Sequence, residues 1–314
     1  MDGRGAVVPA NLCSLSAVTM DSLTVVIPTY NRAKVLRKAL LGYKAQSDPE
    51  QITELIVVDD GSTDDTESVV RLAGAGSPFP VRYLRQSNKG PAAARNVGIR
   101  EARGRLILFT DDDIIPTPTL VAEHLAWHAA QPGLAEAILG YVTWAPEINA
   151  TPFMVWYGSD GPLFAYGHFK DCREVGFSYF YTCNLSLKVE FLRENGTFDE
   201  EFPTAAYEDV ELGYRLDKRG MRLFYNPEAL AYHHQYVSFE DACHRAKKAA
   251  LAREVLLRKE AGRLHASAPN LKRRIGRKAV RWAAPFLSPL KVFMDKTVPL
   301  PWGVYRVMLR VFGG

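Results

Sequence analysis

Three consecutive aspartates, Asp111 to Asp113, follow directly on an apolar run that has the composition of a buried strand. The run is LILFT, residues 106–110, and the chain turns apolar again immediately after the triplet. Clustered carboxylates at a strand end repel one another, and burying them without a partner is costly. We therefore expect something positive to lie beside the triplet.

Four further polar groups stand where predicted elements begin or end. They are Pro28 to Arg32, Asp59 to Ser62, Glu208-Asp209 and His233-His234. Turn formation and helix capping would also explain the short polar residues around Gly61. Acidic residues in the first turn of a helix likewise stabilise its amino terminus. The residue types alone leave a structural and a chemical interpretation open at these places.

The elements that must position these groups alternate between strand and helix through the first 145 residues. Apolar runs rich in β-branched residues predict strands at 23–28, 52–60, 80–85, 105–110 and 137–143. Helical patterns lie between them, at 33–45, 65–73, 92–102 and 119–130. This order predicts βαβ units and a mainly parallel sheet, with ligands at the carboxyl ends of the strands. The polar groups after the first, second and fourth strands are therefore expected at one edge of the sheet.

The pattern changes after residue 143. Residues 144–169 are irregular and aromatic, which suits either an aromatic binding surface or a loop that packs on its own domain. A helix is expected over YEDVELGYRLDKRG, with Gly220 as its stop. The segment MRLFYNPEALAYHH predicts two short strands around a turn, and a long helix is expected from Ser238 to Leu264.

Charge is divided unevenly along the chain. The formal net charge is +4, but residues 244–314 carry 17 Lys and Arg against 3 Asp and Glu, which leaves 22 against 32 in the preceding part. An acidic body repels free polyanions, whereas a basic tail attracts an anionic surface. The tail mixes its basic residues with Trp, Phe, Leu and Val, which suits an element lying on an anionic membrane or one packed on the domain or a second copy. No zinc-finger spacing, RNA-binding signature or basic-region heptad accompanies it, so we expect no nucleic-acid partner.

Cysteine usage and the N-terminal segment bear on the compartment. The four cysteines form no C-x-x-C pair and no metal-ligand spacing, which is typical of a reducing compartment; they are Cys13, Cys172, Cys183 and Cys243. Residues 1–20 lack the continuous apolar block of a signal peptide, and no window reaches the roughly twenty apolar residues of a membrane-spanning helix. We expect a cytoplasmic protein, with the basic tail as a candidate for peripheral attachment to the inner face of the cell membrane.

Six segments occur in a defined order: VVIPTYNR, VVDDGSTDDT, NKGPAAARNVGIREARG, FTDDD, YEDVELGYRL and PEALAYHH. Together, over roughly residues 23–234, they closely resemble the family-2 glycosyltransferases of the GT-A fold. The resemblance implies an α/β fold with a Rossmann-like, mainly parallel central sheet flanked by helices, here followed by a helical basic extension. It also implies transfer of a sugar from a nucleotide donor, a UDP-sugar being favoured, with inversion and the help of Mn²⁺ or Mg²⁺. The expected acceptor is a saccharide or a lipid-linked group of a cell-surface glycan.

The same resemblance assigns residues to roles. Those expected around the nucleotide-sugar are Pro28, Tyr30, Arg32, Asp60, Lys89, Arg95, Asp111 and Asp112. Asp113 matches the metal ligand of the D-x-D motif, and His233, in preference to His234, matches the histidine that completes the metal and diphosphate site. Asp209 matches the catalytic base, with Glu208 holding the acceptor or the helix terminus. Three residues are candidates for acceptor contacts, with core packing as the alternative: Trp156, Tyr157 and Asn184.

Elementary chemistry agrees with these roles. A hard divalent cation prefers oxygen ligands and commonly bridges a carboxylate to phosphate oxygens. An acceptor hydroxyl needs a positioned carboxylate to take its proton as it attacks. A retaining glycoside hydrolase would use two carboxylates but no metal and diphosphate site, and the glycine motifs of dehydrogenases and P-loop proteins are absent.

Two alternatives stay open. A sugar nucleotidyltransferase of the same fold would want a basic, glycine-rich loop, which Pro28 to Arg32 does not supply. A noncatalytic nucleotide-sugar-binding or membrane scaffold would not need Asp209 together with the three aspartates. The expected organisation is a flexible arm at 1–20, a GT-A domain at 21–237 and a helical, basic region for membrane association at 238–314. Within the domain, residues 21–145 form the nucleotide-sugar half and residues 146–237 the acceptor half.

Overall fold

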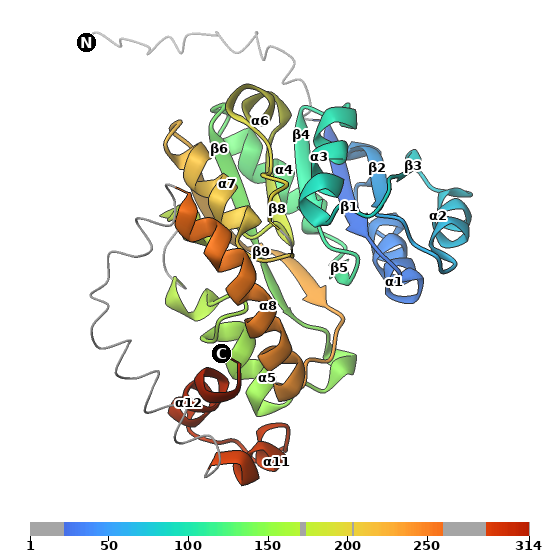
Figure 1. Cartoon of the computed structure of the whole chain (residues 1–314). Helices are drawn as coiled ribbons and strands as arrows, with labels where there is room; N and C mark the ends of the chain where they lie inside the picture. The colour runs from blue at the N-terminus through green and yellow to red at the C-terminus, as the bar shows by residue number, and fades with distance from the viewer. Residues whose placement is uncertain (1–21, 170–173, 203, 260–286, 314) are drawn as a thin grey trace, which may run out of the picture.

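The computed structural model describes residues 22–169, 174–202, 204–259 and 287–313 (Figure 1). Within these ranges nine strands form one sheet in the order β3-β2-β1-β4-β8-β6-β9-β5, and β7 pairs with β9. The strands are β1 (Leu23–Thr29), β2 (Ile52–Asp59), β3 (Val81–Arg85), β4 (Leu106–Thr110), β5 (Ile114–Pro116), β6 (Glu136–Trp144), β7 (Glu174–Val175), β8 (Asn184–Lys188) and β9 (Arg222–His233).

The helices lie on both faces of this sheet, and some lie beyond it, at the lower end of the view in Figure 1. The α-helices of the described residues are α1 (Ala33–Lys44), α2 (Thr66–Gly74), α3 (Pro91–Glu101), α4 (Leu120–Ala130), α5 (Pro152–Ser159), α6 (Val189–Asn195), α7 (Glu208–Asp217), α8 (Phe239–Arg258), α11 (Lys291–Met294) and α12 (Trp302–Phe312). Short 3₁₀ turns connect them: η1 (Pro49–Gln51), η2 (Pro146–Ile148), η3 (Tyr166–His168), η4 (Phe177–Tyr179) and η5 (Ser288–Leu290). Each of the five strands and four helices predicted before residue 145 is present, with its ends shifted by at most two residues.

The sheet is parallel in one half and mixed in the other. Strands β3, β2, β1 and β4 are parallel to one another, as predicted for βαβ units. β8 then pairs antiparallel with both β4 and β6, and β5 pairs antiparallel with β9. The carboxyl ends of β1, β2 and β4 therefore meet at one edge, because these three strands are neighbours and run the same way.

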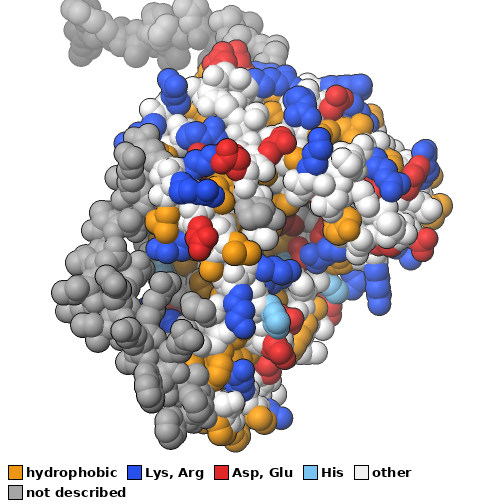
Figure 2. All heavy atoms as spheres, viewed as in Figure 1, with side chains coloured by type: hydrophobic (Ala, Val, Ile, Leu, Met, Phe, Trp, Pro, Cys, Tyr) orange, Lys and Arg blue, Asp and Glu red, His pale blue; other side chains and the backbone are white. Residues whose placement is uncertain are grey.

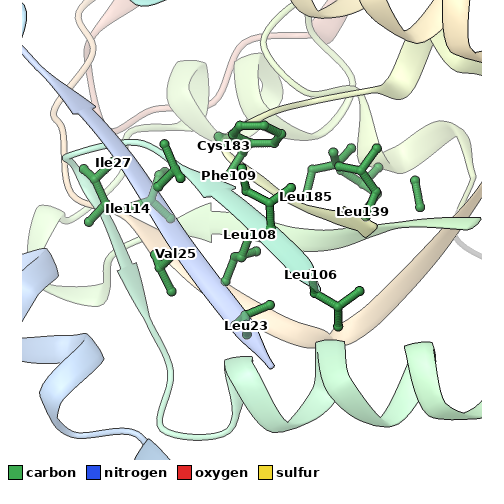
Figure 3. Close-up of a cluster of buried hydrophobic side chains, with 14 of the residues drawn as sticks. Leu23, Val25, Ile27, Leu106, Leu108, Phe109, Ile114, Leu139, Cys183 and Leu185 are labelled. Atoms are coloured by element: carbon green, nitrogen blue, oxygen red, sulfur yellow. The ribbon is translucent and has the colours of Figure 1, made fainter. Parts of the chain in front are cut away.

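Alternate residues of the central strands build the core shown in Figure 3. Leu23, Val25 and Ile27 of β1 lie on the side of the sheet that also carries Leu106 and Leu108 of β4, and all five are fully buried. The opposite face of β1 is covered by α3, where a Cβ added to Gly98 would come within 2.3 Å of Val26. A glycine is required there because the helix backbone packs directly on the strand, and this packing determines how far α3 reaches into the site.

Strand β9 corrects one prediction. The segment expected to form two short strands around a turn is one continuous strand that runs parallel to β6. The pairing moves from Asn226 opposite Gly140 to Leu230 opposite Tyr141, so three residues bulge out of the ladder. The Asn184 side-chain amide donates to the backbone carbonyls of Ala229 and Tyr141, which satisfies the bulge and keeps the strand intact.

The C-terminal helices pack on the rest of the molecule. α8 begins with a capping box between Ser238 and Asp241 and lies against α7 through Ala252, Val255 and Leu256. α12 covers α5, where Tyr305 stacks on Trp156 with ring centroids 5.7 Å apart. The arm at 1–20 and the predicted continuation of α8 from residue 260 to 264 lie outside the described residues. No helix in the described ranges is long and apolar enough to span a membrane.

Candidate active site

The aspartate triplet lies at the carboxyl end of β4, beside the end of β1. Asp112 and Asp113 are buried, whereas the side chain of Asp111 is about one third exposed. The Thr29 hydroxyl donates to Asp112 Oδ2 over 2.8 Å. Burial raises the pKa of Asp112 to about 7, an effect that the charge of Asp113 increases and that of Arg32 opposes. Arg32 is thus a positive partner of the kind expected from the sequence, supplied by the chain itself.

Two basic groups converge on Asp113. Arg32 Nη2 lies 2.5 Å from Asp113 Oδ2, and Arg32 Nε lies 3.2 Å from Asp112 Oδ1. His233 Nε2 lies 3.2 Å from the same oxygen, Asp113 Oδ2. Burial alone would raise the pKa of Asp113, but His233 and Arg32 outweigh it and hold this pKa well below its usual range. Asp113 is therefore ionised at neutral pH, with Arg32 and His233 in contact with the same oxygen.

The loop after β1 is held in place by the loop after β2. Asn31 has φ +53°, a left-handed conformation that asparagine tolerates. Its backbone N–H donates to Ser62 Oγ and its side-chain oxygen accepts from the Thr63 N–H. Asp60, also buried, accepts from Gln86 Nε2 and from the N–H groups of Lys89 and Gly90. These bonds orient the loop so that Arg32 points toward the aspartates.

Arg95 joins the triplet to the first turn of α7. Its Nη2 lies 2.8 Å from Asp111 Oδ1, and its Nη1 lies 3.0 Å from Glu208 Oε1. The guanidinium is buried and lies over the ring of Phe198, 5.7 Å from the centroid. Arg95 therefore connects two acidic motifs that lie far apart in the sequence, because α3 carries it into the gap between β4 and α7.

The Glu208-Asp209 pair is positioned by an unusual backbone at its N-terminal side. Tyr207 has φ +67°, which is rare for a bulky residue, and it directly precedes α7. Glu208 is buried against Arg95, and burial raises its pKa although Arg95 opposes the shift. Burial raises the pKa of Asp209 to about 7, and the charge of Glu208 adds to this effect. Asp209 therefore has a pKa suited to exchanging a proton near neutrality.

The two adjacent histidines face different surroundings, as alternation along a strand predicts. His233 is buried, contacts Asp113 and stacks on Trp144 with centroids 5.1 Å apart. His234 contacts Lys38 and Glu147 through its Nε2. The structure thus brings His233, and not the ring of His234, to the aspartate triplet.

The sequence of this chain matches two models of known protein families. Residues 106–312, more than half of the chain, match the family model described as Glycosyl transferase family group 2. Residues 24–147 match the model described as Glycosyl transferase family 2. The chain is a family 2 glycosyltransferase. The fold and the ordered motifs of the sequence agree with this membership.

This glycosyltransferase has relatives of several activities. It is 33% identical over 230 residues to the validoxylamine A glucosyltransferase of Streptomyces hygroscopicus subsp. jinggangensis, an alignment that covers 66% of this chain and 54% of the relative. It is 29% identical over 254 residues to the chondroitin synthase of Escherichia coli, covering 72% of this chain and 37% of the synthase. The chain thus spans about half the length, or less, of these curated relatives.

Solved structures share its architecture. A mannosyltransferase from Pyrobaculum calidifontis, in complex with GDP-Man and Mn²⁺, superposes with a TM-score of 0.63 at 18% identity, covering 94% of this chain and 86% of that one. TarS of S. aureus, residues 1–349, in complex with UDP-GlcNAc, gives a TM-score of 0.56 at 20% identity, covering 76% and 71%. At these identities the likeness shows the fold, which is the GT-A fold of glycosyltransferases.

The side chains of this glycosyltransferase supply only some of the ligands that a divalent cation needs. Within the described ranges no group of three or more His, Cys, Asp and Glu is arranged to hold a metal. Asp113 Oδ2 and His233 Nε2 nevertheless lie 3.2 Å apart. A carboxylate and an imidazole are both ligands of Mn²⁺-type cations, whose remaining ligands commonly come from phosphate oxygens and water. The residues present therefore fit a cation that arrives with a diphosphate.

The remaining predicted site residues occupy varied places. Pro28 is buried inside β1, Tyr30 is exposed at 47%, and Lys89 is exposed with its backbone N–H on Asp60. The three residues suggested for acceptor contacts are 5% exposed or less: Trp156, Tyr157 and Asn184. Two of them pack under α12, and Asn184 holds the bulge of β9. Their burial leaves them no surface to offer an acceptor in this structure.

Three residues of the site were given no individual role by the sequence interpretation. Thr29 hydrogen-bonds Asp112, Trp144 covers His233, and Tyr207 sets the start of α7. Thr29 could have been found, because it directly follows the predicted first strand, at the same edge as the triplet. No local signal marks Trp144 or Tyr207, since a stacking partner and a left-handed φ depend on tertiary packing.

Proposed function

We propose that this glycosyltransferase moves one sugar from a nucleoside-diphosphate sugar, a UDP-sugar first, to a hydroxyl of a saccharide or lipid-linked acceptor. The observation that carries the proposal is the Arg95 bridge, which places the Glu208-Asp209 pair next to the aspartate triplet. A proton acceptor and a site for an anionic leaving group thereby lie side by side. The two named neighbours solved with GDP-Man and UDP-GlcNAc support a donor of this class.

The residues act in the following way. Asp209 takes the proton from the acceptor hydroxyl as its oxygen forms a bond to the anomeric carbon, while the bond from that carbon to the diphosphate breaks. A single displacement of this kind inverts the anomeric centre. Glu208 stays paired with Arg95 and holds its place beside Asp209. Asp113 and His233 would hold Mn²⁺ or Mg²⁺, which when bound offsets charge on the departing diphosphate.

Binding of donors tests the first step. We expect calorimetry with UDP-, GDP- and dTDP-sugars to show that the sugars of one nucleotide bind at least tenfold more tightly than the others, and only when Mn²⁺ is present. Asp113→Asn should lower that metal-dependent affinity at least tenfold, because it removes one charged oxygen ligand. Asp65→Asn, at the start of α2, is a matched loss of one acidic charge and should change little. If no nucleotide-sugar binds with or without Mn²⁺, the donor site is refuted.

Peripheral attachment to a membrane is also part of the proposal. Six exposed apolar residues lie within 18 positions near the C-terminus, at 39% to 68% exposure: Leu290, Val292, Phe293, Val298, Trp302 and Val307. Exposed basic residues alternate with them, including Lys291, Lys296 and Arg306. Figure 1 places α11 and α12 together at the end of the molecule opposite α6. Apolar side chains surrounded by basic ones suit an anionic bilayer surface.

Cosedimentation with vesicles tests this attachment. The full-length protein should bind vesicles of mixed phosphatidylcholine and phosphatidylglycerol, and the double variant Phe293→Glu, Trp302→Glu should bind at least fivefold less. Both substitutions place a negative charge where an apolar side chain would meet the lipid. Leu72→Glu, at a residue 75% exposed on α2, is the matched control and should bind like the wild type. Equal binding of the double variant and the wild type would show that this surface does not contact the lipid.

A further inference from the structure

Arg32 occupies a position that its expected role on the nucleotide does not explain. Its guanidinium contacts both buried aspartates of the triplet, with Nη2 2.5 Å from Asp113 Oδ2 and Nε 3.2 Å from Asp112 Oδ1. The same Asp113 oxygen is 3.2 Å from His233 Nε2. The oxygen and nitrogen that would ligate a cation are therefore already in contact with a positive group or with each other.

We propose that Arg32 is a resident counter-cation, which stays paired with Asp112 and Asp113 in the donor-free enzyme and leaves them to the divalent cation only when the donor diphosphate binds. This inference rests on the proposed function of the same site. It makes Arg32 a positioning residue that couples donor binding to cation binding.

Charge explains why the two cations exclude each other. Asp113 is 3% exposed, so the interaction of its carboxylate with a positive partner is only weakly screened by water. A divalent cation on Asp113 Oδ2 would stand within a few ångströms of the guanidinium, and like charges at that separation repel strongly. Arg32 must therefore leave before or as the cation binds.

The attachment of Arg32 allows it to leave. Its side chain is 37% exposed, in contrast to the buried carboxylates it contacts. Arg32 is the N-cap residue of α1. The preceding residue, Asn31, is hydrogen-bonded to the loop that contains Ser62 and Thr63, so the backbone is held in place while the guanidinium can move. A guanidinium binds phosphate oxygens in bidentate fashion as well as it binds carboxylates. The diphosphate thus offers Arg32 a new partner of the same kind.

Thermodynamic coupling follows from this exchange. If the diphosphate removes Arg32 from the aspartates, it raises the affinity for the cation, and the cation raises the affinity for the diphosphate by the same factor. The cation alone must compete with Arg32 and so binds weakly. This arrangement keeps a positive partner on the buried carboxylates when no donor is present and selects for the complete pair of cation and donor.

Titration of the protein with Mn²⁺ alone, followed by electron paramagnetic resonance, tests the inference without any turnover. Arg32→Gln should bind Mn²⁺ at least tenfold more tightly than the wild type, because the competing charge is gone. Mn²⁺ should also raise the melting temperature of Arg32→Gln more than that of the wild type. The ratio of Mn²⁺ affinities with and without saturating UDP or GDP should fall at least tenfold in the variant.

Matched variants separate this effect from a general loss of charge. Arg37→Gln removes the same charge from an exposed position on α1 and should bind Mn²⁺ within twofold of the wild type. Arg32→Lys retains the charge on a single ammonium group, which holds two carboxylates less well, and should bind Mn²⁺ at least threefold more tightly than the wild type. If Arg32→Gln does not fold, Arg32→Lys carries the test.

Two outcomes would overturn the inference. If the Arg32 variants bind Mn²⁺ no more tightly than the wild type while UDP or GDP still binds, Arg32 is not a competing cation, and the proposed function stands. If neither the wild type nor the variants bind Mn²⁺ in the presence of any nucleotide, the proposed metal and donor site fails, and the inference fails with it.

Discussion

Asp209→Asn is expected to lower the turnover number by about 10²- to 10⁴-fold while leaving donor affinity within about twofold, since general base catalysis contributes this much. The amide keeps the size of the carboxylate but cannot take the acceptor proton. Asp217→Asn, an exposed residue of the same helix, is the matched control and should turn over like the wild type. Unchanged turnover of Asp209→Asn would falsify its role as base.

The pH dependence of the wild type gives a second readout for Asp209. Because burial raises its pKa to about 7, the base form is lost as the pH falls through 7, and turnover should decline on that acid side. Asp209→Asn should lack this limb.

The same substitution should stabilise the fold above pH 7. The pKa of Asp209 is higher in the folded than in the unfolded chain, so the folded state retains the proton and stability falls as the pH rises from about 4 to 7. Asparagine removes this ionisation. Allowing for solvent screening at a partly exposed carboxyl, the gain at pH 8 is of order 1 kcal/mol, or roughly 2–4 °C in melting temperature.

Arg95→Met is expected to cost about 3–5 kcal/mol of folding free energy, the range for removing one partner of a buried ion pair. Arg95 is 4% exposed and bridges Asp111 and Glu208, so methionine leaves Glu208 buried without its counter-charge. Turnover should also fall at neutral pH. Arg95 opposes the rise in the pKa of Asp209, so without it the acid limb should move to higher pH.

Chemical denaturation and the pH profile together check this prediction. Arg222→Met breaks an exposed ion pair with Glu174 and should leave the denaturation midpoint close to that of the wild type. If Arg95→Met does not fold, Arg95→Lys retains one charge and should show a smaller loss of stability with the same direction of shift in the acid limb. If a folded Arg95 variant loses turnover over the same acidic pH range as the wild type, Arg95 and Asp209 are not electrostatically coupled.

Local patterns in the sequence predicted much of the fold. The alternation of apolar runs and helical periods predicted β1, β2, β3, β4 and β6 with α1 to α4, because each period reflects which face of one element is buried. Because these strands were predicted to be parallel, the carboxyl ends of the first, second and fourth strands were expected at one edge of the sheet. Placement of the aspartate triplet there needed no knowledge of distant contacts.

Partnerships between distant residues were decided by the tertiary structure. Arg95 and Glu208 are 113 positions apart, and His233 and Asp113 are 120 apart. Which basic group meets which carboxylate depends on strand register and on how closely α3 packs at Gly98, and neither has a local signature. The same is true of Trp156 and Tyr157, for which the sequence left acceptor contact and core packing as alternatives and which the structure packs against α12.

The sequence by itself therefore determined the family, the five strands and four helices predicted before residue 145, and the chemistry available at one edge of the sheet, because these are encoded in short periods and ordered motifs. Only the tertiary structure decided that Arg32 contacts Asp112 and Asp113 and that Arg95 joins Asp111 to Glu208. It also decided that β9 continues through its bulge and brings His233 to Asp113. The physical reason is that long-range side-chain contacts are set by packing and register, which no short stretch of sequence contains.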